Sequence, residues 1–172
     1  NTTINSGNLL LQGGNALPDT GTVTLNSPSA TLTIGTSETI GSLQGMGTTA
    51  INAGQALTIA QTGNTTYSGS IVGAGSLYLT GTGILTLSGN STYSGGTVLQ
   101  IGTLVLAGMN AAGSGRIEQP AFSDWSLLQI ATTGTISNNM VVQNLLATQS
   151  ATLAGGIYLD TAVMNVQSGT TL

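Results

Sequence analysis

An internal repeat is the feature of this sequence that most constrains its fold. The segment Gly63–Gly69 (GNTTYSG) recurs as Gly89–Gly95 (GNSTYSG), and the match continues downstream with one inserted residue. A unit of this size cannot bury an apolar face by itself, whereas a stack of such units forms a continuous core. The repeat therefore predicts a solenoid with about 26 residues in each coil.

Short runs of alternating apolar and polar residues indicate the elements of this solenoid. Leu, Ile or Val occupies alternate positions, mainly Thr occupies the others, and Gly, Asn or Ser follows each run. Alternation with a period of two is typical of half-buried β-strands. The runs with this pattern are Thr22–Leu25, Ala30–Ile34, Ala56–Ile59, Leu77–Leu79, Ile84–Leu87, Leu104–Leu106 and Ile157–Leu159.

One repeat unit contains three apolar strands, centred near Ile71, Leu77–Leu79 and Leu85–Leu87. Three strands per unit fit one coil of a three-sided solenoid, in which each strand pairs with the coils above and below at about 4.8 Å. A sandwich built from hairpins would favour Asn-Gly or Asp-Gly turns, and neither dipeptide occurs. We therefore predict an all-β fold, a right-handed parallel β-helix with little or no α-helix.

The repeat also predicts where particular residues lie. Tyr67 and Tyr93, and likewise Asn64 and Asn90, occupy equivalent positions, so we expect them to form ladders between coils rather than a row of ligand contacts. Six leucines should point into the core: Leu77, Leu79, Leu85, Leu87, Leu104 and Leu106. Four glycines should lie at turns and supply φ values that other residues resist: Gly63, Gly69, Gly89 and Gly95.

Composition excludes several classes of function. Charged residues are 3% of the chain, and Arg116 is its only basic residue. The chain contains no Cys and no His. Phosphate binding needs Lys and Arg, so nucleic acid is not an expected partner. Disulfides and thiolate metal sites are excluded, and no cofactor is indicated. No apolar run is long enough to span a bilayer.

The five acids do not form a pattern that indicates an active site. They are Asp19, Glu38, Glu118, Asp124 and Asp160. Several β-helix proteins degrade polysaccharides with two or three acids gathered on adjacent coils. With coils of about 26 residues, none of the spacings here stacks two acids in register, so no catalytic residue is predicted.

The segment 118–125 interrupts the strand pattern and is predicted to be an insertion or a large turn. It holds the only Phe and the only Trp of the chain. Phe122 and Trp125 either form an aromatic platform for a glycan or protein partner, or cover the core beneath the insertion. Arg116 lies two residues before Glu118, so the two share a face if this run is a strand. They form either a carbohydrate-binding or catalytic pair, or a surface ion pair. The candidate contact residues are therefore Phe122, Trp125 and Arg116.

Residues Leu79–Thr97, with Ile101–Leu106 after them, resemble the autotransporter-associated β-strand repeat, and the likeness is best over 63–107. This resemblance implies a bacterial passenger region that is exported across the outer membrane and is either displayed at the cell surface or secreted. Contact with a membrane would occur only through a C-terminal barrel, which this sequence does not contain. We expect residues 1–172 to be a single β-helix segment of a longer passenger.

Three hypotheses for function follow. The uniform, nearly uncharged repeat favours a structural and adhesive shaft, whose partners would be a host-cell receptor, a glycan or like molecules. The first alternative is a polysaccharide-degrading enzyme on the same scaffold, which needs a cluster of acids. The second is a self-assembling fibre module, because open strand edges and low charge both favour association.

Overall fold

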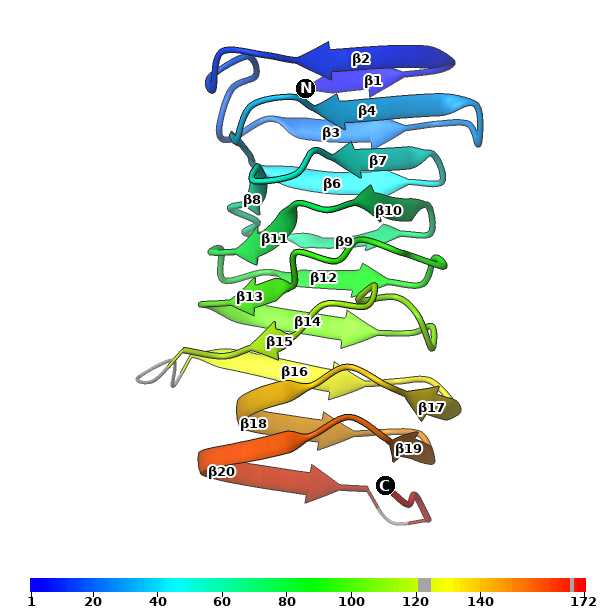
Figure 1. The fold of residues 1–172 in the computed structure, drawn as a ribbon, viewed down its shortest axis with the longest axis vertical. Helices are drawn as coiled ribbons and strands as arrows, with labels where there is room; N and C mark the ends of the chain where they lie inside the picture. The colour runs from blue at the N-terminus through cyan, green and yellow to red at the C-terminus, as the bar shows by residue number, and fades with distance from the viewer. Residues whose placement is uncertain (121–124, 168) are drawn as a thin grey trace.

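The computed structural model describes residues 1–120, 125–167 and 169–172. All regular structure in these residues is β-strand, which confirms the predicted all-β fold. The strands stack coil upon coil along one long axis, with the N-terminus near one end and the C-terminus near the other (Figure 1). No helix in the described ranges is long and apolar enough to cross a membrane.

The strands form three rows that run along the stack, and each complete coil visits the rows in turn. The first row holds β1 (Thr2–Ile4), β3 (Thr22–Leu25), β6 (Ser42–Gly45), β9 (Asn64–Tyr67), β12 (Ile84–Leu87), β14 (Gly102–Leu106) and β16 (Ser126–Ile130). The second row holds β2 (Gly7–Leu11), β4 (Ala30–Ile34), β7 (Thr48–Ile51) and β10 (Ser70–Gly73), with β17 (Gly134–Ile136) and β19 (Ala151–Leu153) further along. The third row holds β5 (Glu38–Ile40), β8 (Ala56–Ile59), β11 (Ser76–Leu79), β13 (Thr97–Leu99) and β15 (Ile117–Glu118).

The last two long strands join the third row to the first. β18 (Met140–Ala147) pairs with β15 through its first half and with β16 through its second half, and β20 (Ile157–Val166) pairs along most of β18. Strand pairing among the described residues is parallel throughout. The predicted parallel β-helix is therefore confirmed.

The coil length predicted from the sequence repeat is wrong. Asn64 pairs with Ile84 and Leu57 pairs with Leu77, so a coil in the middle of the chain is about 20 residues long. One unit of the sequence repeat contains four strands, β9 to β12, which is one coil and one further strand. The fourth strand, Asn64–Tyr67, escaped detection because Thr65 stands at the inward position where an aliphatic residue would have shown the alternation.

Because the sequence repeat is longer than a coil, the predicted ladders of like residues are also wrong. Tyr67 pairs with Leu87 in the first row, whereas the Tyr93 amide donates to the carbonyl of Ile71 in the second row. Asn64 pairs with Ile84, while the side-chain amide of Asn90 accepts a hydrogen bond of 2.9 Å from that of Asn110. Equivalent positions of the repeat therefore lie in different rows.

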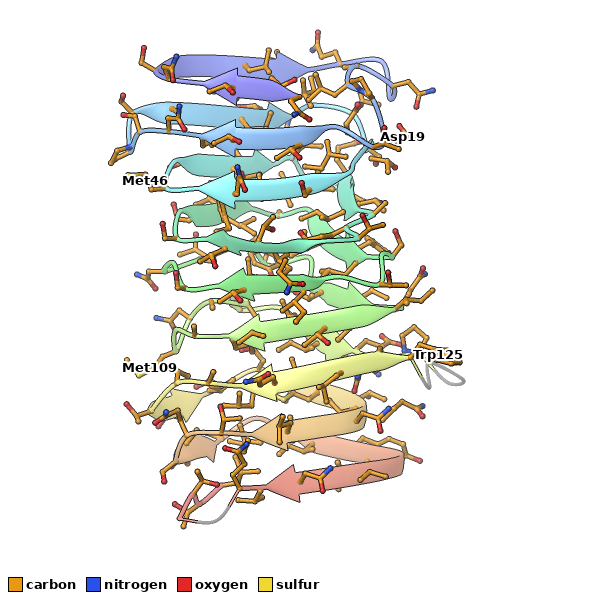
Figure 2. The ribbon with its side chains drawn as sticks, turned by 180° about the vertical axis from the view of Figure 1, so that it is seen from behind. Asp19, Met46, Met109 and Trp125 are labelled. Atoms are coloured by element: carbon orange, nitrogen blue, oxygen red, sulfur yellow. The ribbon has the colours of Figure 1, made fainter. Side chains whose placement is uncertain are left out.

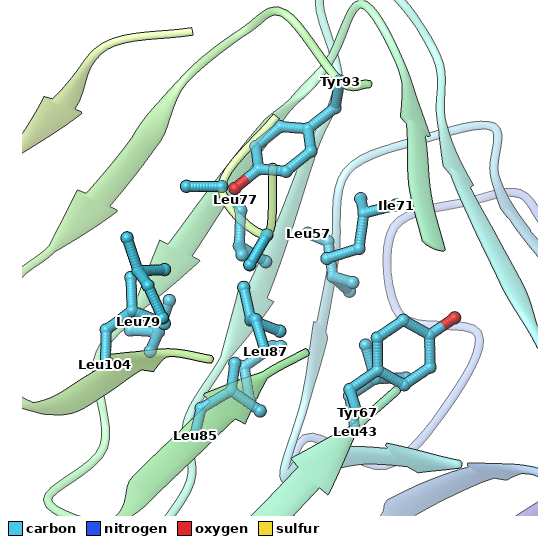
Figure 3. Packing of buried hydrophobic residues seen from close by; sticks show 14 of the residues in the cluster. Leu43, Leu57, Tyr67, Ile71, Leu77, Leu79, Leu85, Leu87, Tyr93 and Leu104 are labelled. Atoms are coloured by element: carbon cyan, nitrogen blue, oxygen red, sulfur yellow. The ribbon is translucent and has the colours of Figure 1, made fainter. Parts of the chain in front are cut away.

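The core lies inside the three rows and runs along most of the stack. All six leucines predicted to point inward are buried, which confirms the strand phase. Figure 3 shows leucines from several coils gathered in this core together with Ile71, Tyr67 and Tyr93. The Tyr67 hydroxyl donates to the carbonyl of Gly47 at 2.8 Å and lies 2.9 Å from the Thr49 hydroxyl, and the Tyr93 hydroxyl pairs with Thr97.

The four predicted turn glycines do lie between strands, but the expected reason is wrong. Gly63, Gly69, Gly89 and Gly95 are not among the glycines with positive φ. A Cβ atom at Gly69 would overlap the carbonyl oxygen of Gly47, and one at Gly89 would overlap that of Gly69. At these two positions the close approach of successive coils, rather than backbone conformation, requires glycine.

Replacing Leu85 with Asp should lower the free energy of unfolding by several kcal/mol, because it places an unpaired charge in the core. Thr86→Asp is the matched control, since Thr86 is only half-buried and alternates to the outside of the same strand. Urea denaturation followed by circular dichroism measures both. Equal midpoints for the two variants would contradict the strand phase.

Deleting residues 64–83 joins Gly63 to Ile84, which occupies the position of Asn64 one coil further along. Since each coil contacts mainly its two neighbours, we expect a shorter protein that remains folded and β-rich. Deleting residues 64–89, one unit of the sequence repeat, is the matched control. It removes β12 as well and leaves the chain without a first-row strand at that level, so this variant should lose ordered structure by circular dichroism. Equal folding of both variants would overturn the coil length deduced from the strand pairing.

Replacing Tyr67 with Phe tests the buried hydroxyl. Burial raises the pKa of Tyr67 to about 12 and raises that of Tyr93 further, so folding favours the neutral phenols. The resulting stability is present below pH 10 and is lost as the pH rises toward 12. Tyr67→Phe should cost about 1–3 kcal/mol at neutral pH, because it leaves buried partners of the hydroxyl unsatisfied. The variant should also lose less stability than the wild type as the pH rises from 10 toward 12. If the urea midpoints of the two proteins had the same pH dependence, Tyr67 would not be the group that titrates.

Candidate functional site

Trp125 is the most exposed large hydrophobic residue that the structure describes. It immediately precedes β16, and 82% of its surface is exposed. Its carbonyl accepts a hydrogen bond of 2.9 Å from the amide of Gly102 in the preceding coil, so its main chain is held while its ring projects outward. Figure 2 shows it at the edge of the stack. Phe122, its predicted companion in an aromatic platform, lies outside the described residues.

A groove of about 270 Å³ lies beside Trp125. It crosses β16 and the second halves of β18 and β20, and it contains both apolar and amide side chains. The residues that line it are Trp125, Ser126, Leu127, Asn144, Leu145, Val163 and Asn165. Leu128 pairs with Leu145 and Asn144 pairs with Val163, so parallel pairing between successive coils sets the floor of the groove.

A buried glutamine, Gln119, stabilises the corner of the coil between β15 and β16, next to the groove. Gln119 follows β15 and is fully buried, and its Oε1 atom accepts hydrogen bonds from the amides of Gln143 and Asn144 at 2.8 and 3.1 Å. Its Nε2 atom donates to the Ser126 hydroxyl at 2.9 Å. The side-chain amide of Asn144 in turn donates to the carbonyl of Ser126 at 3.2 Å. One side chain therefore ties β18 to the start of β16 beneath Trp125.

Sequence reasoning missed this corner. Two other glutamines are also buried after a strand of the third row. Gln61 follows β8, and Gln143 follows the first half of β18, the half that pairs with β15. Gln61 bonds within its own corner to Gly63, Thr65 and Ile84. The sequence feature that could have predicted this corner is a glutamine one or two residues after the end of a strand, because most other polar residues of the chain are Thr, Ser and Asn.

Arg116 lies away from the groove. Its guanidinium is 3.8 Å from the Glu118 carboxylate, and both side chains are about half exposed. An exposed pair of this kind contributes less than about 1 kcal/mol. The two residues are brought together as predicted, with the geometry of a surface ion pair, and Arg116 is not among the residues that line the groove.

Two of the described acids, Glu38 and Glu118, are far apart. Glu38 is buried and accepts hydrogen bonds from the amides of Ala16 and Leu17, at 3.1 and 2.7 Å, which fastens the loop before β3. Four strand spacings separate it from Glu118 in the third row, about 19 Å at about 4.8 Å each. Asp19 lies in the turn before β3. Over the described residues, no group of three or more Asp, Glu, His or Cys could hold a metal ion. The side chains of Asp124 and Asp160 lie outside the described part.

Residues 77–106 match the family model described as the passenger-associated-transport-repeat. This segment matches the passenger repeats of autotransporters. The matched residues run from β11 through β12 and β13 to β14, which is one complete coil and two further strands. Searches among curated proteins and among solved structures found no match for the chain.

The groove lies outside this passenger repeat, in the coils that follow it.

The hydrogen bonds of Gln119 can be tested by substitution. Replacing Gln119 with Leu leaves the amides of Gln143 and Asn144 without their acceptor, which should cost about 1–3 kcal/mol for each amide that stays buried. Gln129→Leu is the control, because among the described residues the half-buried Gln129 side chain bonds only to Thr148, at 3.5 Å. Hydrogen exchange of residues 140–147 should quicken in the first variant and not in the second. Unchanged exchange in both would contradict the role of Gln119.

Proposed function

We propose that this chain is a segment of a β-helical shaft in an exported bacterial protein of the autotransporter type, and that the shaft is adhesive rather than enzymatic. The passenger repeat carries this proposal. The matched family is one of passenger repeats, and its members occur in exported or surface proteins. The match extends over a whole coil, so it concerns the unit from which the stack is built.

The outer surface of the first row supports a shaft. Its outward side chains are mainly Thr, Ser, Gln and Asn with a few aliphatic residues, and none of them is ionisable. Neighbouring coils bond through these side chains, as between Ser42 and Thr22 at 2.9 Å and between Gln44 and Thr24 at 3.0 Å. Such a surface stiffens the stack without needing a bound ligand.

The adhesive part of the proposal has support from the surface at one end of the shaft. Trp125 is exposed beside a groove on a well-paired sheet, and aromatic residues are enriched where proteins contact partners. The enzymatic alternative needs two acids close together. Glu38 and Glu118 are too far apart for this role, and Glu38 is already bonded to two amides.

The test uses the parent protein on intact bacterial cells. Protease treatment of whole cells should release this segment, and cells that display it should adhere to host cells or matrix more than cells that lack the gene. Protection from external protease, or adhesion that does not depend on the protein, would contradict the proposal.

A second measurement addresses the enzymatic alternative. The purified chain is incubated with neutral and acidic polysaccharides, and new reducing ends are counted. We expect none above background. Release of reducing ends that disappears in Asp124→Asn or Asp160→Asn, but persists in Asp19→Asn, would replace the shaft with an enzyme.

A further inference from the structure

The groove beside Trp125 combines an exposed aromatic ring with neutral polar groups. The indole projects from a main chain that is bonded to the preceding coil. Leu127 and Val163 place aliphatic groups next to it, and Asn144 and Asn165 add two side-chain amides. None of the lining residues is ionisable, so nothing in the lining would attract an ionic ligand.

The polar groups of the groove have capacity for further hydrogen bonds. A side-chain amide offers two N–H donors and an acceptor oxygen. Asn144 gives one N–H to the carbonyl of Ser126, which orients its side chain. Asn165 pairs through its main chain with Leu146 and presents an exposed side chain on β20. Two amides on adjacent strands therefore border an apolar floor.

These groups match the two kinds of surface on a sugar ring. A pyranose has a face of C–H groups that packs on an aromatic ring, and a rim of hydroxyls that exchange hydrogen bonds with amides. A protein partner would normally need about 800 Å² of contact from this side, whereas the groove of about 270 Å³ is closer to the lower size limit for small ligands, about 300 Å³.

We propose that this groove binds a neutral oligosaccharide, with a pyranose ring stacked on Trp125 and its hydroxyls bonded to Asn144 and Asn165. This inference rests on the proposed adhesive function and names its ligand class and its site. Because the strands of the groove are already paired with one another, binding would need little rearrangement of the main chain.

Trp125 is the only tryptophan of the chain, so its fluorescence reports on this site alone. The chain is titrated with maltohexaose, cellohexaose and chitohexaose as neutral probes and with a heparin hexasaccharide as the anionic one. We expect at least one neutral probe to shift the emission to shorter wavelength in a saturable way, and heparin to have no effect. Isothermal calorimetry with the same probes supplies an affinity that does not depend on the tryptophan.

Calorimetry on variants tests the contacts. Trp125→Ala should weaken the affinity by about tenfold or more, and Asn165→Ala should weaken it by a smaller factor. The matched control is Tyr158→Ala, which removes an exposed aromatic residue, 65% accessible, that does not line the groove. Circular dichroism of each variant checks that the fold is retained.

Several results would overturn the inference: no response to any neutral probe, equal binding by Trp125→Ala and wild type, or binding of heparin alone. A protein ligand that depends on Trp125 while no oligosaccharide binds would also overturn it. Adhesion of intact cells separates the two proposals. Adhesion that survives Trp125→Ala would leave the adhesive shaft in place without this site, whereas no adhesion by the parent protein would remove the proposed function itself.

Discussion

Main-chain pairing between successive coils is the constraint on which the rest of this structure depends. Each strand in the middle of the stack finds its hydrogen-bond partners about 20 residues earlier and later, at the same place on the same row. That pairing holds neighbouring strands about 4.8 Å apart and decides which side chains point inward. Leucines of successive coils therefore pack on one another, and positions such as Gly69 and Gly89 have no room for a Cβ atom. Stability in such a stack is close to a sum of local terms.

The same pairing positions the groove beside Trp125 on a stack whose other coils resemble one another. Within the regular coils the outward side chains of the first row bond to their neighbours and leave an uncharged surface. Beyond β15 this uniformity is broken at Gln119, a buried side chain that supplies the acceptor required by two amides of β18. The main chain of Trp125 is bonded to Gly102 of the preceding coil, and its ring stands in solvent beside the groove that Asn144 lines.

Sequence patterns predicted the elements of the fold better than their spacing. Alternation of Leu, Ile and Val with Thr located the strands and the buried leucines, because period two follows directly from strand geometry. The coil length was misjudged because the sequence repeat spans four strands, one of which presents Thr65 rather than an aliphatic residue to the core. Trp125 was chosen as a candidate contact by its chemistry alone. The groove beside it needed the three-dimensional pairing of β16, β18 and β20, which no local pattern contains.

Engineered disulfides measure the central claim, the spacing of successive coils along the sequence, most directly, since the chain has no cysteine of its own. Thr66 and Thr86 face each other on neighbouring first-row strands, at a separation that a disulfide can bridge. Thr66 and Thr92 are equivalent in the sequence repeat but lie in different rows. Mild oxidation should cross-link the pair Thr66→Cys and Thr86→Cys readily and the pair Thr66→Cys and Thr92→Cys poorly, as mass spectrometry of peptides would show. Efficient cross-linking of the second pair instead of the first would contradict the coil and the stack built from it.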